Sequence, residues 1–229
     1  MYLRKEWDNP KFYEKYFGKN PDMNKYYIKE LQRKLSLLPQ EQEEYTIAAY
    51  GSLMNTEDIP RTLGNKCEYI KGFLPGYERI FDVGNFDTGS YLNIRPLNIE
   101  EDSLEGKDYD ENGIIVNLIT VSKDKIPDYI MREGYYEPEI VTCYYDNGSS
   151  VEAITVISDH DQIGLQPMLN YVHLCVSGAK EFAGIEGLNC MMNNTMCYST
   201  KQCSYISLKE WLSKVNLVNL MIQQPYTKR

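Results

Sequence analysis

A glutamate in an aromatic setting is the first candidate for chemistry. Glu133 lies in the segment MREGYYEP, residues 131–138, at the end of an expected helix and before Gly134 and two tyrosines. A carboxylate among aromatic rings loses contact with water, which raises its pKa toward neutrality and suits it to general acid/base catalysis. The alternative for this segment alone is a surface charge paired with Arg132 or Lys125.

The segment AYGSLM, residues 49–54, is the second candidate. An apolar run over residues 45–50 ends here, and Gly51 and Ser52 interrupt it before an apolar pair follows. Glycine permits a sharp turn and lets a ligand approach the main chain. The segment is either an ordinary strand-to-helix turn or a loop that holds a ligand.

Histidine and cysteine point to little chemistry. His173 lies in an apolar helical stretch, where a packed or surface role is expected, and His160 lies in the polar sequence SDHDQ. Asp159, His160 and Asp161 could bind a metal, but adjacent side chains rarely converge on one ion, so we expect no metal site. The cysteines form no CxxC pair and are expected to be reduced, some of them in the core. They are Cys67, Cys143, Cys175, Cys190, Cys197 and Cys203.

The sequence FDTGS, residues 86–90, resembles the signature of aspartic proteases. That chemistry requires two aspartates that share a proton, whereas this chain has one copy, at Asp87. A homodimer would have to supply the second. An apolar strand should lead into the motif, and the sequence DVGNF at 82–86 does not provide one. The residues of the motif favour turns. We therefore expect a turn, with a dimeric protease as the weaker alternative.

Composition limits the class of protein. The chain has 229 residues, of which 42% are hydrophobic, and a formal net charge of −9. This length suffices for one sizeable domain with an appendage. An acidic chain lacks the basic face that binds nucleic acid or an anionic membrane, so we expect neither partner. The sequence contains no apolar run of the roughly 20 residues that span a bilayer. Its first residues, MYLRKEWDNP, have no apolar core of the kind found in signal peptides, so we expect none. We expect a cytoplasmic protein, and its oligomeric state stays open.

The pattern of apolar residues and turn formers predicts strands first and helices mostly later. This order favours an α+β domain over alternating βαβ units. The expected hairpin over residues 139–158 turns at Asp146, Asn147 and Gly148, and the acidic stretch 98–112 is expected to be a solvated loop. The other expected strands are 45–50, 67–77, 78–83, 90–97 and 113–121, and the expected helices are 123–136, 166–183 and 207–222.

Residues 1–44 differ in composition from the rest, being rich in Lys, Glu, Tyr and Gln, and they predict a helical N-terminal arm. Ile28, Leu31, Leu35 and Leu38 recur at spacings of three and four, which is a helical apolar stripe. This stripe must pack either on the domain or on a partner. We therefore divide the chain into a helical arm (1–44), one domain (45–205) and a C-terminal helix with a tail (206–229).

Several short motifs occur in an order that resembles the gamma-glutamylcyclotransferase superfamily. The resemblance covers about residues 45–200 and includes segments similar to a bacterial branch of the family. The motifs are YGSL at 50–53, RTLG at 61–64, LNIRP at 92–96, NGIIVNL at 112–118, REGYY at 132–136, and Tyr171 followed by Gly178, Ala179, Lys180 and Glu181.

The resemblance implies a small mixed β-barrel with helices around it and a ligand cavity at one mouth. Enzymes of the family cyclise a γ-glutamyl group: the α-amine attacks the γ-carbonyl of the same group, which releases an amine and 5-oxoproline. Because the ring closure is intramolecular, the enzyme supplies orientation and no cofactor is implied. Glu133 would take the proton from the attacking ammonium and return it to the leaving amine.

The resemblance also assigns a substrate pocket. Gly51 would let the main chain turn sharply after Tyr50. The main-chain N–H groups of Ser52, Leu53 and Met54 would then bind a substrate carboxylate or the developing oxyanion. The aromatic rings that would line the pocket are those of Tyr50, Tyr136 and Tyr171.

Departures from the family pattern leave questions open. Many members have asparagine after YGS, whereas this chain has Leu53, as glutathione-specific forms do. The segment REGYY is short, so either Tyr135 or Tyr136 takes the family role. No motif in the sequence identifies the leaving amine. The alternative function is a non-catalytic module on the same fold that binds a small ligand or a protein. The arm would dock on the barrel, cover the pocket or bind a partner.

Overall fold

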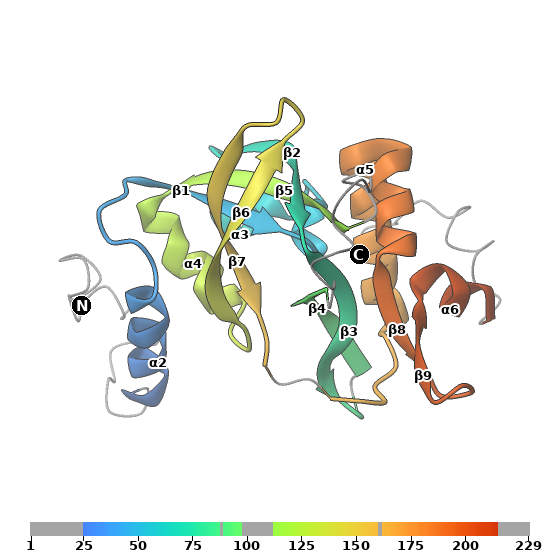
Figure 1. Ribbon diagram of the computed structural model, residues 1–229. Coiled ribbons are helices and arrows are strands. Elements are labelled where there is room, and N and C mark those ends of the chain that lie inside the picture. Colours follow the sequence, from blue (N-terminus) through green and yellow to red (C-terminus); the bar gives the residue numbers. More distant parts are fainter. Residues whose placement is uncertain (1–24, 88, 98–111, 160–161, 215–229) are drawn as a thin grey trace.

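The computed structural model describes residues 25–87, 89–97, 112–159 and 162–214. These residues form a β-barrel and a second sheet, with helices packed against both (Figure 1). Several expectations lie outside the described residues: the start of the arm, nearly all of the acidic loop, His160 with Asp161, and the end of the last expected helix.

The barrel is closed and has five strands in the order β1-β5-β2-β6-β7. Neighbouring strands are antiparallel, except that β1 and β7 pair in parallel. β5 pairs with both β1 and β2 and is almost wholly buried, as its continuous apolar sequence predicts. The expected mixed barrel is confirmed. Its strands are β1 (Glu44–Ala49), β2 (Glu68–Pro75), β5 (Gly113–Ser122), β6 (Glu137–Tyr145) and β7 (Ser150–Ile157).

A four-stranded sheet with the order β4-β3-β8-β9 lies beside the barrel. β8 and β9 were not among the predicted strands, because they are short and because β8 pairs in parallel with a strand far away in the sequence. The strands are β3 (Tyr77–Asn85), β4 (Gly89–Pro96), β8 (Thr195–Ser199) and β9 (Ser204–Ser207).

Of the FDTGS segment, Phe86 and Asp87 form a turn after β3, Gly89 and Ser90 begin β4, and Asp87 is exposed. One part of the expectation was wrong, because an apolar strand does lead into this turn. Ile80, Phe81 and Val83 of β3 are all buried.

Helix α5 (Leu169–Asn193) continues past its expected end at residue 183. The helix is interrupted at Ala183 and Gly184 and then resumes. Gly184 has a φ of 62°, a left-handed conformation that glycine adopts at little cost. The other helices are α2 (Lys25–Ser36), η1 (Ser52–Met54), α3 (Ile59–Leu63), η4 (Lys123–Lys125), α4 (Ile126–Arg132) and α6 (Leu208–Lys214).

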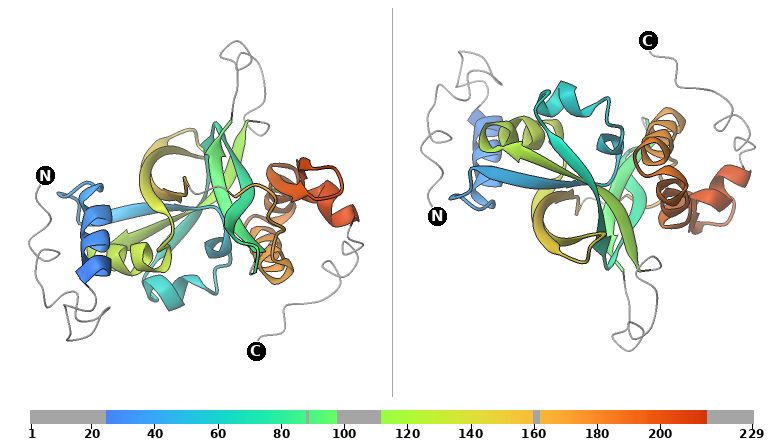
Figure 2. Two further views of the ribbon diagram at one scale, coloured as in Figure 1. Left: turned by 90° about the horizontal axis from the view of Figure 1, so that it is seen from below. Right: turned by 90° about the horizontal axis from the view of Figure 1, so that it is seen from above.

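The apolar stripe of the N-terminal arm packs on the domain. Leu31, Leu35 and Leu38 are buried and belong to the same hydrophobic cluster as the barrel. α2 lies beside α4 in each view (Figures 1 and 2). The described part of the arm is therefore docked, which answers one of the questions that the sequence left open.

Candidate active site

A cavity of about 730 Å³ lies where the end of β1, the end of α4 and the start of α5 meet. Its lining is rich in tyrosine and contains one acid–base pair, formed by Arg132 and Glu133. The predicted site residues that line the cavity are Glu133, Tyr50, Gly51, Ser52, Leu53, Tyr136 and Tyr171. Residues from distant parts of the sequence thus meet in one place.

The loop after β1 forms one wall of this cavity. Residues 52–54 make a single 3-10 turn, in which the N–H of Met54 donates to the carbonyl of Gly51 at 3.0 Å. The first N–H groups of a helix have no acceptor within that helix. Ser52 and Leu53 both line the cavity, and main-chain N–H groups at the start of such a turn are suited to binding an anion.

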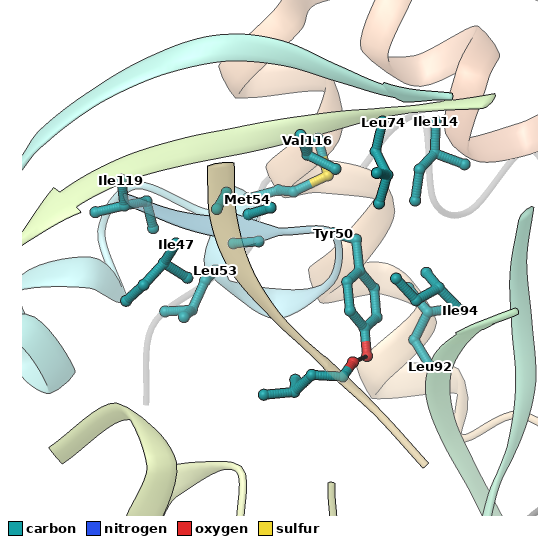
Figure 3. Packing of buried hydrophobic residues seen from close by; sticks show 14 of the residues in the cluster. Ile47, Tyr50, Leu53, Met54, Leu74, Leu92, Ile94, Ile114, Val116 and Ile119 are labelled. Carbon is teal, nitrogen blue, oxygen red and sulfur yellow. Dashed lines mark hydrogen bonds between the residues drawn. The ribbon is translucent and has the colours of Figure 1, made fainter. Parts of the chain in front are cut away.

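Met54 belongs to the core, which corrects its expected place in the pocket. Its side chain is fully buried, and its N–H is used in closing the turn. Figure 3 shows Met54 directed toward Val116, whereas the Tyr50 ring extends toward Leu92. The turn is so tight that its last residue faces away from the cavity.

Two glycines let neighbouring groups approach the loop closely. A Cβ atom on Gly51 would lie 3.2 Å from the hydroxyl of Tyr171. A Cβ atom on Gly178, in α5, would lie 2.7 Å from the main-chain nitrogen of Asn55. A larger side chain at position 178 would therefore displace the loop or the helix. This contact explains the glycine in the motif on α5.

A fully buried arginine, Arg79 of β3, supports the loop from behind. Its Nε donates to the carbonyl of Tyr50 at 2.8 Å, and its Nη2 donates to the carbonyl of Ile115. The C=O and N–H of a trans peptide point in opposite directions. The bond from Arg79 to the Tyr50 carbonyl therefore turns the N–H of Gly51 the other way.

Glu133 lies in a second wall, at the end of α4. Glu133 is the C-terminal cap of the helix, and its N–H donates to the carbonyl of Tyr129 at 3.0 Å. The N–H of Tyr136 in turn donates to the carbonyl of Glu133 at 2.8 Å. This turn places the Glu133 side chain, which is 17% exposed, in the cavity wall.

Burial dominates the electrostatics of this wall. It raises the pKa of Glu133 above its ordinary value of 4.5, and the charge and hydrogen bond of Arg132 partly oppose the rise. Burial also raises the pKa of Tyr50, Tyr129 and Tyr171. These hydroxyls stay protonated, and the carboxyl has the raised pKa that suits an acid/base group.

Arg132 joins the two walls. Its Nη1 donates to a carboxylate oxygen of Glu133, and its Nη2 donates to the hydroxyl of Ser52 at 2.8 Å. The pairing of Glu133 with Arg132 was one alternative from the sequence, and it occurs within the cavity lining rather than on an open surface. The guanidinium also offers a positive charge to a bound carboxylate.

The tyrosines fix the shape of the cavity. The hydroxyl of Tyr50 donates to the carbonyl of Val156 at 2.7 Å, and that of Tyr136 donates to the carbonyl of Leu92 at 2.8 Å. The Tyr171 ring packs edge-on against Tyr91, with centroids 5.1 Å apart. Both Tyr135 and Tyr136 line the cavity, but Tyr135 is 86% exposed, whereas Tyr136 is fixed by its bond to Leu92.

Tyr91 and Tyr129 also line the cavity and were not among the predicted site residues. Tyr129 lies four positions before Glu133 on α4, and this helical spacing could have identified it. Tyr91 reaches the cavity through the packing of the second sheet on the barrel, for which the local sequence has no signal.

Other expectations concern cysteines, metals and membranes. All six cysteines are free, and Cys143, Cys175 and Cys197 are buried, as expected. Within the described ranges, we find no group of three or more His, Cys, Asp or Glu side chains that could hold a metal ion. No helix in that part of the chain has both the length and the apolar character needed to cross a membrane.

Comparison with known proteins identifies the fold. No protein-family model and no curated protein matches the sequence. A solved structure of a gamma-glutamyl cyclotransferase matches with 16% identity and a TM-score of 0.50, over 62% of this chain and 81% of that chain. A crystal structure of an uncharacterized protein from Homo sapiens matches with 16% identity and a TM-score of 0.51, over 62% of this chain and 82% of that chain. The chain therefore has the fold of the gamma-glutamyl cyclotransferases.

Proposed function

We propose that the protein is a cyclotransferase that converts a γ-glutamyl amine or peptide to 5-oxoproline and a free amine, with Glu133 as the general acid/base. One observation carries the proposal. A mostly buried carboxylate of raised pKa and a turn with main-chain donors line the same cavity. The fold supports the same reading, although a fold by itself hosts many functions.

In the proposed reaction, the wall that carries Glu133 transfers protons, and the loop after β1 stabilises the oxyanion. Glu133 accepts a proton from the α-ammonium of the substrate, and the freed amine attacks the γ-carbonyl carbon. The N–H groups of Ser52 and Leu53 stabilise the resulting oxyanion. Glu133 then returns this proton to the leaving nitrogen, and the C–N bond to the leaving amine breaks. The attacking nitrogen gives up its second proton through Glu133 to the released amine, which departs as an ammonium ion and leaves the ring amide N–H of 5-oxoproline. No water is consumed, because the nucleophile and the electrophile belong to one molecule.

A second function, ligand binding without catalysis, is favoured by the Arg132 bond to Glu133. A carboxylate held by a guanidinium is stabilised in its charged form and is a weaker base. In the cyclotransferase, the substrate carboxylate attracts Arg132, and the substrate ammonium takes its place beside Glu133. In a binding module, the ion pair persists and only fixes the shape of the pocket.

The release of 5-oxoproline separates the two functions. The purified protein is incubated with glutathione, γ-glutamyl dipeptides, γ-glutamyl-ε-lysine and γ-glutamyl polyamines. We expect release from at least one substrate and a loss of about 10²–10⁴-fold in Glu133→Gln. Asp87→Asn is the matched control, because Asp87 is an exposed carboxylate in the β3–β4 turn, and it should keep full activity. Release from none of the substrates by the folded protein would favour the binding module.

A further inference from the structure

The N-terminal helix α2 inserts a buried lysine behind the wall that carries Glu133. Lys34 is only 4% exposed. Its Nζ donates to the main-chain carbonyls of Gly134 and Tyr136, each at 2.7 Å. An ammonium group is rarely buried in a protein without hydrogen-bond partners, and here the partners are the main chain directly after Glu133.

The bonds to Lys34 complete the support of this short segment. On the cavity side, the hydroxyl of Tyr136 donates to the carbonyl of Leu92. Within the segment, the N–H of Tyr136 donates to the carbonyl of Glu133. On the side of α2, the Nζ of Lys34 donates hydrogen bonds to the carbonyls of Gly134 and Tyr136. The segment 133–136 is therefore held from two sides at once.

A second contact ties the same helix to the next residue of the chain. Arg33 donates through Nη2 to the carboxylate of Glu137, at 2.5 and 2.6 Å, and also bonds Glu30 on its own helix. This pair is about half exposed and contributes little to stability by itself. It does fix the direction in which the chain leaves the segment to enter β6.

We propose that α2 is part of the active site, and that Lys34 is a positioning residue that holds the Glu133 segment in its productive geometry. The proposal rests on the cyclotransferase function of Glu133. Lys34 acts through the main chain and does not touch the reacting atoms. Because a misplacement of about 1 Å at a catalytic group can cost about 10²-fold in rate, the arm becomes a requirement for turnover.

The first test compares Lys34→Met with Lys29→Met in the full chain. Lys29 lies on the exposed face of the same helix, so it controls for the loss of a charge from α2. We expect Lys34→Met to lower kcat by about 10²-fold with little change in KM, and Lys29→Met to behave as the wild type. Lys34→Arg keeps donors for both carbonyls and should restore part of kcat. A folded Lys34→Met with wild-type kcat would overturn the proposal.

The second test needs neither a variant nor a substrate. In native-state hydrogen exchange of the wild type, we expect the amides of α2 and the amide of Tyr136 to open together as denaturant is added. Opening of α2 that leaves Tyr136 protected would overturn the role of Lys34. If the wild type releases no 5-oxoproline, the proposed function fails, and this exchange experiment still decides whether α2 holds the segment.

Discussion

The loop 51–54 and the segment 133–136 line the same cavity, but they are held in different ways. Arg79, fully buried, holds the loop from the interior, and α5 closes on it at Gly178. The Glu133 segment is held by the N-terminal helix, through Lys34 and the half-exposed pair of Arg33 and Glu137. The loop 51–54 is thus held by residues of the domain's core, whereas the segment 133–136 is held by residues of α2.

This difference separates two requirements of the proposed reaction. Main-chain donors for an oxyanion must be preorganised, and groups fixed by close packing are the most rigid. A proton-transfer group must serve first as a base and then as an acid, and the turn after α4 that carries it contains two exposed residues, Gly134 and Tyr135. We therefore expect changes in the first wall to affect stability and activity together, and changes in the second to affect mainly activity.

The largest effect is expected from Arg79→Met. This change removes the donors to the carbonyls of Tyr50 and Ile115, and each buried acceptor left without a partner costs about 1–3 kcal/mol. We expect a loss of several kcal/mol in unfolding free energy, measured by urea denaturation, together with the loss of turnover. Arg95→Met is the control, because Arg95 is a half-exposed arginine of β4 paired with Glu78. If Arg79→Met and Arg95→Met had the same unfolding free energy, this would contradict the dependence of the loop 51–54 on Arg79.

A pair of glycine variants tests the comparison directly. A Cβ atom on Gly178 would lie 2.7 Å from the nitrogen of Asn55, whereas one on Gly134 would lie 3.6 Å from the nearest neighbour, the carbonyl of Met131. We expect Gly178→Ala to cost about 1–3 kcal/mol through overpacking, and Gly134→Ala to leave the melting temperature nearly unchanged. Calorimetry of both variants measures their melting temperatures and unfolding free energies. If Gly134→Ala lowered the melting temperature and Gly178→Ala did not, the segment 133–136 would be the tightly packed wall and the loop 51–54 would not.

The smallest effect, a gain in stability, is expected from Glu133→Gln. The folded chain raises the pKa of Glu133 above 4.5, so the folded state binds this proton more tightly than the unfolded chain does. Stability is therefore lost as the pH rises from about 4.5 through the raised pKa. Glu133→Gln should melt at a higher temperature than the wild type above this range and at the same temperature below it.

Melting curves across the pH range measure this gain. The matched control is Glu152→Gln, because Glu152 is an exposed residue of β7, and its effect should not follow the same pH dependence. A difference between Glu133→Gln and the wild type that is constant with pH would contradict the burial of the Glu133 charge.

The sequence predicted what depends on local pattern. The apolar runs of β1 and β5, the hairpin turn at Asn147 and the stripe on α2 all follow from spacing and turn chemistry. The resemblance added the roles expected of Glu133 and of the loop after Tyr50. Arg79 and Lys34 were missed, because each acts on a carbonyl far away in the sequence. A positive residue within a strand or an amphipathic helix normally indicates a solvated face, and only tertiary packing buries it.

The bonds of Lys34 also bear on how the chain assembles during synthesis. Its acceptors lie 100 and 102 positions later in the sequence, so α2 leaves the ribosome long before they exist. At a translation rate of about 5–20 residues per second, the helix waits roughly 5–20 s for them. Until then, the leucines of its stripe have no α4 to pack against. The proposed active site thus joins a helix to a segment that is made about 100 residues after it.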